Sequence, residues 1–179
     1  EAGHSVTIID VKDEHTQMAA LPEGKSFNVI YLEEINLELF DSPYGDQYDW
    51  VKTIINLAKE GGIGIHPSHE RLLLRYVREL ISEKGKITFF DLVNKCENNL
   101  VNEEISAPEK NKILGCLEFL HSIIDQLRLR SDKPTQKISD VFINKNRILP
   151  IQKLSEPMAK FSASFIVLYL FKYKQYYHD

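Results

Sequence analysis

The chain has only two cysteines, no long hydrophobic run and no block of like charges in its 179 residues. Cys96 and Cys116 lack metal-ligand spacing and lie within apolar helical patterns, so we expect buried, reduced side chains in a cytoplasmic protein. The densest apolar run, 165–171, is far shorter than the roughly 20 residues that a membrane-spanning helix needs. These absences argue against a disulfide-rich secreted fold and against a membrane protein.

The chain also lacks a strongly basic surface. Its net charge is −4, with 22 Lys and Arg residues interspersed among 26 Asp and Glu residues. A domain that binds nucleic acid by itself usually gathers its cations on one face. We therefore expect any contact with DNA to be made by other parts of a larger protein.

Three short apolar segments have the character of β-strands. Residues 6–10 (VTIID) are apolar up to a terminal acid, which is typical of a strand buried on both faces of a parallel sheet. A second strand is predicted at 27–32, after turn residues, and a third at 148–151. Because Pro150 has no N–H to donate, the third strand is expected to lie at a sheet edge or to end there.

The stretch from 49 to 130 is predicted to be helical, because apolar residues recur there at helical spacing. The pair Gly61-Gly62 ends the first helix, Pro67 opens the second, and Gly85 ends it.

Two further helix starts are marked by capping residues. Thr88 and Ser106 each stand three positions before an acid, which is the spacing of a capping box. A last helix is predicted to begin at Ser155. It is apolar almost all round over 161–171, which predicts burial against a sheet.

The pattern predicts an α/β protein that is mainly helical, with strands first and last. Residues 1–44 would form the first part of the α/β core, 45–144 a helical insertion, and 145–179 a return to the core as a strand plus a buried helix. Parallel strands in this layout need partners, so the chain is interpreted as a piece of a larger protein.

Several phrases, in their order, resemble the HerA/FtsK-like P-loop ATPases, which include the motors of conjugation and type IV secretion. The string GHSVTIID at 3–10, followed by VKDE at 11–14, is similar to a strand of that family and its "D-P-K/H-G-E" turn. The remaining similar phrases are 35–39 ("INPL"), 73–80 ("LLxxxLxEL"), 87–93 ("pTlxDLl") and 148–155 ("vlvIDLSxL").

The resemblance implies a partial RecA-like P-loop NTPase sheet with a helical insertion, within an ATP-driven translocase or helicase motor. It implies that Asp10 and Glu14 act as catalytic carboxylates and that Lys12 contacts phosphate. It also implies ATP and Mg²⁺ as cofactors of a longer parent protein, which would form a ring of identical subunits.

The chain departs from this family at three points. It has no G-x-x-x-x-G-K-[ST] motif, so by itself it is expected to hold no nucleotide. The resemblance places the phosphate-binding strand before Glu1 and the hydrolytic strand after Asp179. Asp13 stands where glycine is usual, and Gln152 stands where an acid is usual.

Three other interpretations stay open. Asp10 can be a strand-end residue that caps a turn, with residues 12–14 forming a solvated charged loop. The chain can also be a non-catalytic helical protein-interaction module. A Rossmann-type oxidoreductase would use the acid after the first strand to hold the cofactor ribose, but its glycine fingerprint is absent here.

The remaining polar clusters are assigned structural roles. His66 and His69, even with Glu70, lack the spacing of a metal site, and we expect no bound metal. The arginines of 71–78 are expected on a solvated helix face, and the tyrosines of 169–177 are expected to continue a buried helix face.

Overall fold

The protein is described by a computed structural model that covers residues 5–21 and 26–177. Its strands are β1 (Thr7–Asp10), β2 (Phe27–Val29) and β3 (Asn146–Pro150). They form a parallel sheet in the order β1-β3-β2. The three predicted strands and the mainly helical α/β class are thus confirmed, and residues 3 and 4 of the string GHSVTIID lie outside the described residues.

The third predicted strand lies at the centre of the sheet. The sequence predicted that Pro150 lies either on an edge strand or at a strand end. It is the last residue of β3, and β3 is not an edge strand. Ile148 O accepts the N–H of Ile30, so Ile148 directs its backbone groups toward β2. Because backbone groups alternate in direction along a strand, Pro150 is also oriented toward β2. Because β2 has already ended at Val29, a proline at this position removes no ladder hydrogen bond.

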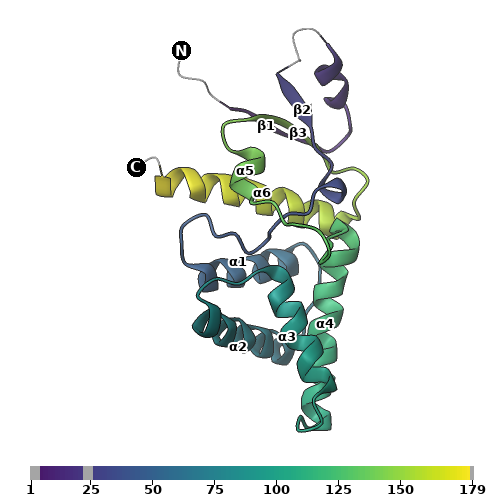
Figure 1. Ribbon diagram of the computed structural model, residues 1–179. Helices are drawn as coiled ribbons and strands as arrows, with labels where there is room; N and C mark the ends of the chain where they lie inside the picture. Colours follow the sequence, from purple (N-terminus) through teal and green to yellow (C-terminus); the bar gives the residue numbers. More distant parts are fainter. Residues whose placement is uncertain (1–4, 22–25, 178–179) are drawn as a thin grey trace.

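Helices make up most of the chain, and most of them lie on one side of the sheet (Figure 1). Their bounds are α1 (Gln47–Glu60), α2 (Pro67–Lys84), α3 (Phe89–Val101), α4 (Ala107–Leu127), α5 (Ile138–Phe142) and α6 (Glu156–Tyr177). The predicted helices are confirmed. The short α5 and the 3₁₀ turns η1 (Thr16–Ala20) and η3 (Leu32–Glu34) were not foreseen.

One of the two predicted capping boxes forms. Thr88 Oγ1 accepts the N–H of Asp91 at 3.1 Å, and Asp91 Oδ2 accepts the N–H of Thr88 at 2.7 Å. The prediction for Ser106 was wrong, since its side chain makes no cap hydrogen bond. Glu109, the acid of that box, lies instead 2.5 Å from Arg75 Nη2 on α2.

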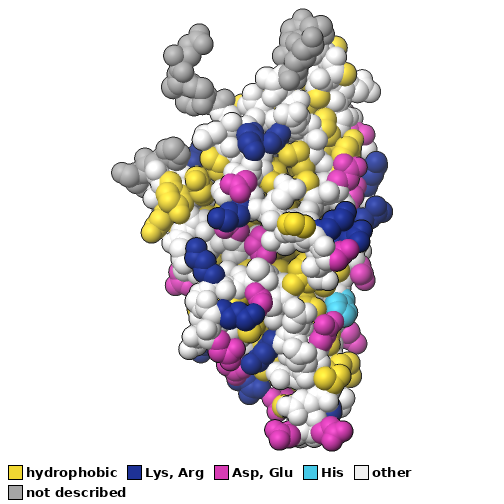
Figure 2. Space-filling view, in the orientation of Figure 1, with side chains coloured by type: hydrophobic (Ala, Val, Ile, Leu, Met, Phe, Trp, Pro, Cys, Tyr) yellow, Lys and Arg dark blue, Asp and Glu magenta, His cyan; other side chains and the backbone are white. Residues whose placement is uncertain are grey.

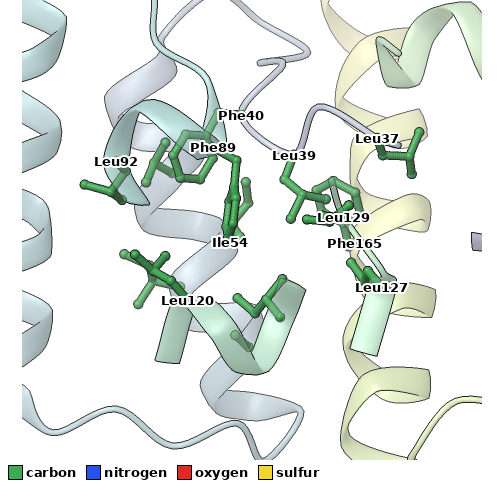
Figure 3. Close-up of a cluster of buried hydrophobic side chains, with 14 of the residues drawn as sticks. Leu37, Leu39, Phe40, Ile54, Phe89, Leu92, Leu120, Leu127, Leu129 and Phe165 are labelled. Atoms are coloured by element: carbon green, nitrogen blue, oxygen red, sulfur yellow. The ribbon is translucent and has the colours of Figure 1, made fainter. Parts of the chain in front are cut away.

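The extended segment after η3 carries the chain from the sheet into the helical block. Its Leu37, Leu39 and Phe40 are buried among side chains of the helices (Figure 3). The Phe40 and Phe89 rings meet edge to face, with centroids 5.3 Å apart. A single buried cluster joins all three predicted segments, from Leu32 to Tyr169.

One expectation about burial was wrong, and another holds for only one face of a helix. Thr7, Ile8 and Ile9 of β1 are half-buried, whereas a strand buried on both faces was predicted. Helix α6 was predicted to be buried against a sheet: its Phe161 and Phe165 lie in the core cluster that includes Leu149 of β3, but Val167 and Phe171 are exposed. The described chain supplies no element to cover the exposed surfaces of β1 and α6. Among the described residues, no helix is long and apolar enough to cross a membrane.

Candidate functional site at the carboxyl ends of the strands

Asp10 is the last residue of β1, and its carboxylate is buried. Oδ1 accepts the N–H of Glu14 at 3.1 Å, and Oδ2 accepts the N–H of His15 at 2.7 Å. The His15 ring lies beside the same carboxylate, with Nδ1 3.4 Å from Oδ1. Asp10 therefore folds the following loop back onto the end of the strand, which is the turn-capping role left open from the sequence.

The loop also sets the ionisation of Asp10. Burial acts to raise the pKa of this carboxyl group, but the N–H groups of His15 and Glu14 and the His15 ring together outweigh it, so the pKa lies below its usual value. The stability that Asp10 contributes is therefore present above its unfolded pKa and is lost as the pH falls through the folded pKa.

Lys12 and Glu14 lie in the same loop, and both are exposed. Within residues 5–21 and 26–177, neither side chain has an ion-pair or hydrogen-bond partner. Their ammonium and carboxylate groups are thus free to meet a ligand at this edge, whereas both oxygens of Asp10 are already engaged. Of the three predicted site residues, Lys12 and Glu14 are therefore the two whose charged groups are available to bind a ligand.

The two residues that depart from the resembled family contact each other. Asp13 adopts the left-handed backbone conformation, with φ of 57°, where glycine is favoured and Asp is among the tolerated residues. Its Oδ2 accepts a hydrogen bond from Gln152 Nε2 at 2.7 Å, and its Oδ1 accepts one from Thr16 Oγ1 at 2.5 Å. The loops after β1 and β3 are joined through this pair.

This contact predicts that the two departures are energetically coupled. Gln152→Glu would place a second carboxylate against Asp13, and we expect it to destabilise the fold by roughly 0.5–1 kcal/mol, since the pair is exposed. In an Asp13→Gly background the same substitution should have no effect. Urea unfolding of the wild type, both single variants and the double variant measures the coupling, and additive effects would contradict it.

Two buried polar side chains follow η3, and neither was singled out from the sequence. Asn36 Nδ2 donates to the carbonyls of Arg130 and Lys133 at 2.8 and 2.9 Å, and its Oδ1 accepts the N–H of Arg130 at 2.9 Å. Glu38 Oε1 accepts the N–H groups of Phe40 and Phe89. The signal was present as polar residues alternating with leucines in 36–39, a period that puts the polar side chains on one face.

The histidines near the start of α2 line a cleft of about 500 Å³ between the 62–66 loop, α4 and the start of α6. Glu70 does not join them, because its Oε2 lies 2.9 Å from Lys59 Nζ. The ring of His69 packs so closely on α4 that a Cβ at Gly115 would lie 2.2 Å from it. No group of three or more potential metal ligands occurs within the described part of the chain.

The other polar clusters have structural partners. Arg75 pairs with Glu109 and Glu79, and the Arg78 guanidinium lies over the Tyr48 ring at 4.6 Å. Acidic and basic side chains alternate over the face drawn in Figure 2, as expected from the sequence.

The tyrosines at the end of α6 differ in burial. Tyr169 is buried and donates its O–H to Asp41 Oδ2 at 2.9 Å. The expectation of a continued buried face was wrong for Tyr176 and Tyr177, which are exposed. Tyr173 lies between these two regions, with its ring stacked on that of Tyr169.

The two cysteines are buried, as predicted, and neither forms a disulfide. Burial raises the pKa of Cys96 and of Cys116 to about 12, so both are thiols at neutral pH. Such groups are poor nucleophiles and poor metal ligands.

Comparison with known proteins adds no assignment: no family model matches the chain, and no curated protein or solved structure matches it either.

Proposed function

We propose that the chain is a segment of an ATP-driven translocase or helicase motor of the HerA/FtsK-like kind. It would lie between the two nucleotide motifs of a parent protein and would supply the helical insertion and the adjoining part of the α/β core. The basis is the order of the similar phrases, together with a parallel sheet that brings the first and last of them side by side.

The observation that carries the proposal is the geometry of the loop after β1. The turn of the resembled family has glycine where this chain has Asp13, and Asp13 takes up a conformation that glycine adopts most readily. The acid usual after the last strand is replaced by Gln152, which donates to Asp13. The two departures from the family's pattern are thus in contact, and the turn has a positive φ at the position where that family usually has glycine.

The sheet supports the same interpretation. In open α/β sheets, ligands bind beyond the carboxyl ends of parallel strands. Asp10 is at the carboxyl end of β1, Lys12 and Glu14 follow it, and Gln152 follows the carboxyl end of β3. ATP with Mg²⁺, held chiefly by a phosphate loop elsewhere in the parent protein, would supply the hydrolysable phosphate here.

Asp10, Glu14 and Lys12 would have separate roles at such a site. Asp10 holds the loop in shape through its two N–H contacts. The exposed Glu14 carboxylate is free to orient water or to accept from a water bound to Mg²⁺, and the Lys12 ammonium is free to contact phosphate. In a ring of identical subunits the same loop would also face a neighbouring copy.

Glu14→Gln in the parent protein tests this function. We expect kcat for ATP hydrolysis to fall by about 10²-fold, because a positioned carboxylate typically contributes that much, with KM little changed. Glu103→Gln, at an exposed turn between α3 and α4, is the matched control and should retain full activity. Hydrolysis by the Glu14→Gln protein at the wild-type rate would contradict the role of Glu14.

A second candidate is the non-catalytic protein-interaction module. The observation in its favour is the exposure of Val167, Phe171, Tyr176 and Tyr177 on α6, since apolar and aromatic side chains gathered on one helix are typical of contact surfaces. This function predicts a parent protein that neither binds nor hydrolyses ATP. The assay above therefore separates the two candidates.

A further inference from the structure

The larger helices cover one face of the sheet, the covered face, whereas on the other, the open face, Ile148 of the central strand is fully buried and the outer strands are partly exposed. Ile9 and Leu149 pair in register and pack with the helical core, as do Phe161 and Phe165 of α6. Ile8 pairs with Ile148 and therefore lies on the opposite face. In Figure 1 the larger helices all lie to one side of the sheet, so among the described residues only the small η1 region remains for the other face.

The open face is apolar. Val29 pairs with Ile148 and so shares its face with Ile8 and Val6. Val6 is 45% exposed, and Ile8 and Val29 are half-buried. Parallel sheets occur almost only with both faces covered, because each face carries apolar side chains. An element that lies outside the described residues is therefore needed over Ile8 and Val29.

Among the described residues, both outer strands also have backbone N–H and C=O groups without a hydrogen-bond partner. Val6 O accepts the N–H of Arg147 at 2.8 Å and Asp10 O accepts that of Ile151 at 3.0 Å, so even-numbered residues of β1 face β3. Thr7 and Ile9 therefore direct their N–H and C=O groups to the free edge. The N–H of Ile30, the residue after β2, points toward β3, so the N–H of Val29 points to the free edge of β2.

The handedness of parallel crossovers decides between the two edges. The connection from β2 to β3 carries helices on the covered face and moves one strand toward β1. Such crossovers are right-handed in about 98% of cases, so every crossover over one face moves in the same direction. Helix α6 packs on α1 and shares the buried cluster of the covered face. A strand that follows α6 must then lie beyond β1.

The same rule applies to an element before β1. A helix that covers the open face leads its chain in the opposite direction, toward β2. If that helix ends in β1, the strand before it also lies beyond β1. Both additions fall on the same edge, and β2 is left as the last strand of the sheet.

We infer that the sheet is completed at the free edge of β1, by a parallel strand of the parent protein that directly follows α6, and that a helix preceding β1 covers Ile8 and Val29. The inference rests on one part of the proposed function, namely that the chain belongs to a larger α/β domain. It requires neither nucleotide binding nor hydrolysis.

Residue-resolved amide hydrogen exchange on the parent protein tests the inference. Exchange at Thr7 and Ile9 should be at least about 100-fold slower than at Val29, whose N–H stays at a free edge. The comparison is internal to one molecule. In the 179-residue chain alone, all three amides should exchange rapidly.

Protection of Val29 without protection of Thr7 and Ile9 would overturn the inference, because the sheet would then grow at β2. Rapid exchange at all three positions in the parent would overturn it as well. Protection at Thr7 and Ile9 in a parent that hydrolyses no ATP would uphold the sheet order and refute the motor function. The two proposals can therefore fail separately.

Discussion

Replacing Trp50 with Ala should lower the free energy of unfolding by about 4 kcal/mol, within the range for truncating a buried aromatic side chain. Trp50 of α1 is fully buried, and its Nε1 donates to Leu39 O at 3.1 Å. Its ring packs against Phe165 and Tyr169 of α6, with centroids 5.7 and 5.8 Å away. The substitution opens a cavity where α1, α6 and the segment from the sheet meet.

Two controls define the result for Trp50. Trp50→Phe keeps most of the packing and loses the hydrogen bond, so we expect a smaller loss of about 1–2 kcal/mol. Tyr176→Ala removes an exposed ring from α6 and should change stability by less than about 0.5 kcal/mol. Urea unfolding followed by far-UV circular dichroism measures all three variants. Equal stabilities for Trp50→Ala and Tyr176→Ala would show that the α1–α6 contact is not part of the core.

Replacing Glu38 with Ala should cost about 3 kcal/mol. Its buried Oε1 accepts two N–H groups, from Phe40 at 3.1 Å and Phe89 at 2.9 Å, and Ala would leave both donors buried without a partner. Oε2 is buried and has no hydrogen-bond partner among the described residues. Glu38→Gln keeps the acceptor oxygen and removes the charge, so it should retain the fold and serve as the matched variant.

Comparison with Glu38→Gln also reveals how the stability contributed by Glu38 depends on pH. Desolvation raises the pKa of Glu38, although the N–H groups of Phe89 and Phe40 act against it. An acid with a raised folded pKa contributes stability that is fully present below its unfolded pKa, near 4.5, and is lost as the pH rises through the folded pKa.

Wild-type protein should therefore lose stability relative to Glu38→Gln between pH 4 and neutral pH. Asp10, whose lowered pKa has the opposite effect, is common to both proteins and cancels in the difference. Urea midpoints at several pH values provide the measurement. If the difference in stability between the two proteins does not change with pH, Glu38 has the same pKa in the folded and the unfolded protein, and the prediction is wrong.

Local patterns were sufficient for most of the secondary structure. The helix opened by Pro67 and closed by Gly85 forms over Pro67–Lys84, and the Thr88 capping box is present. These features depend on neighbours within a few residues, which is the range that periodicity and capping patterns report. The Ser106 box does not form: the Ser106 side chain makes no cap hydrogen bond, and the Glu109 side chain pairs with Arg75 on a different helix.

The arrangement of the sheet and the contacts of Asn36 depend on distant residues. The central place of β3 is set by pairing with two strands that lie more than a hundred residues earlier. The alternation of polar residues and leucines in 36–39 places Asn36 on one face, but its partners lie near residue 130, so the local pattern cannot identify them. The half-exposure of β1 follows from a missing cover, and a strand sequence cannot reveal whether its cover is present.

The candidate site was predicted in part. Asp10 ends β1, and Lys12 and Glu14 lie in the loop that follows it, as their adjacency in sequence required. The sequence left two roles open for Asp10, and its contacts show it holding the loop. The pairing of Asp13 with Gln152 joins residues 139 positions apart and became visible only when β1 and β3 were placed side by side.

The most direct test of the motor assignment is to sequence the gene that encodes the parent protein on both sides of this segment. The account predicts a G-x-x-x-x-G-K-[ST] motif within a few tens of residues before Glu1, and an apolar strand ending in acidic residues soon after Asp179. Extended flanking sequence that contains neither feature would contradict it.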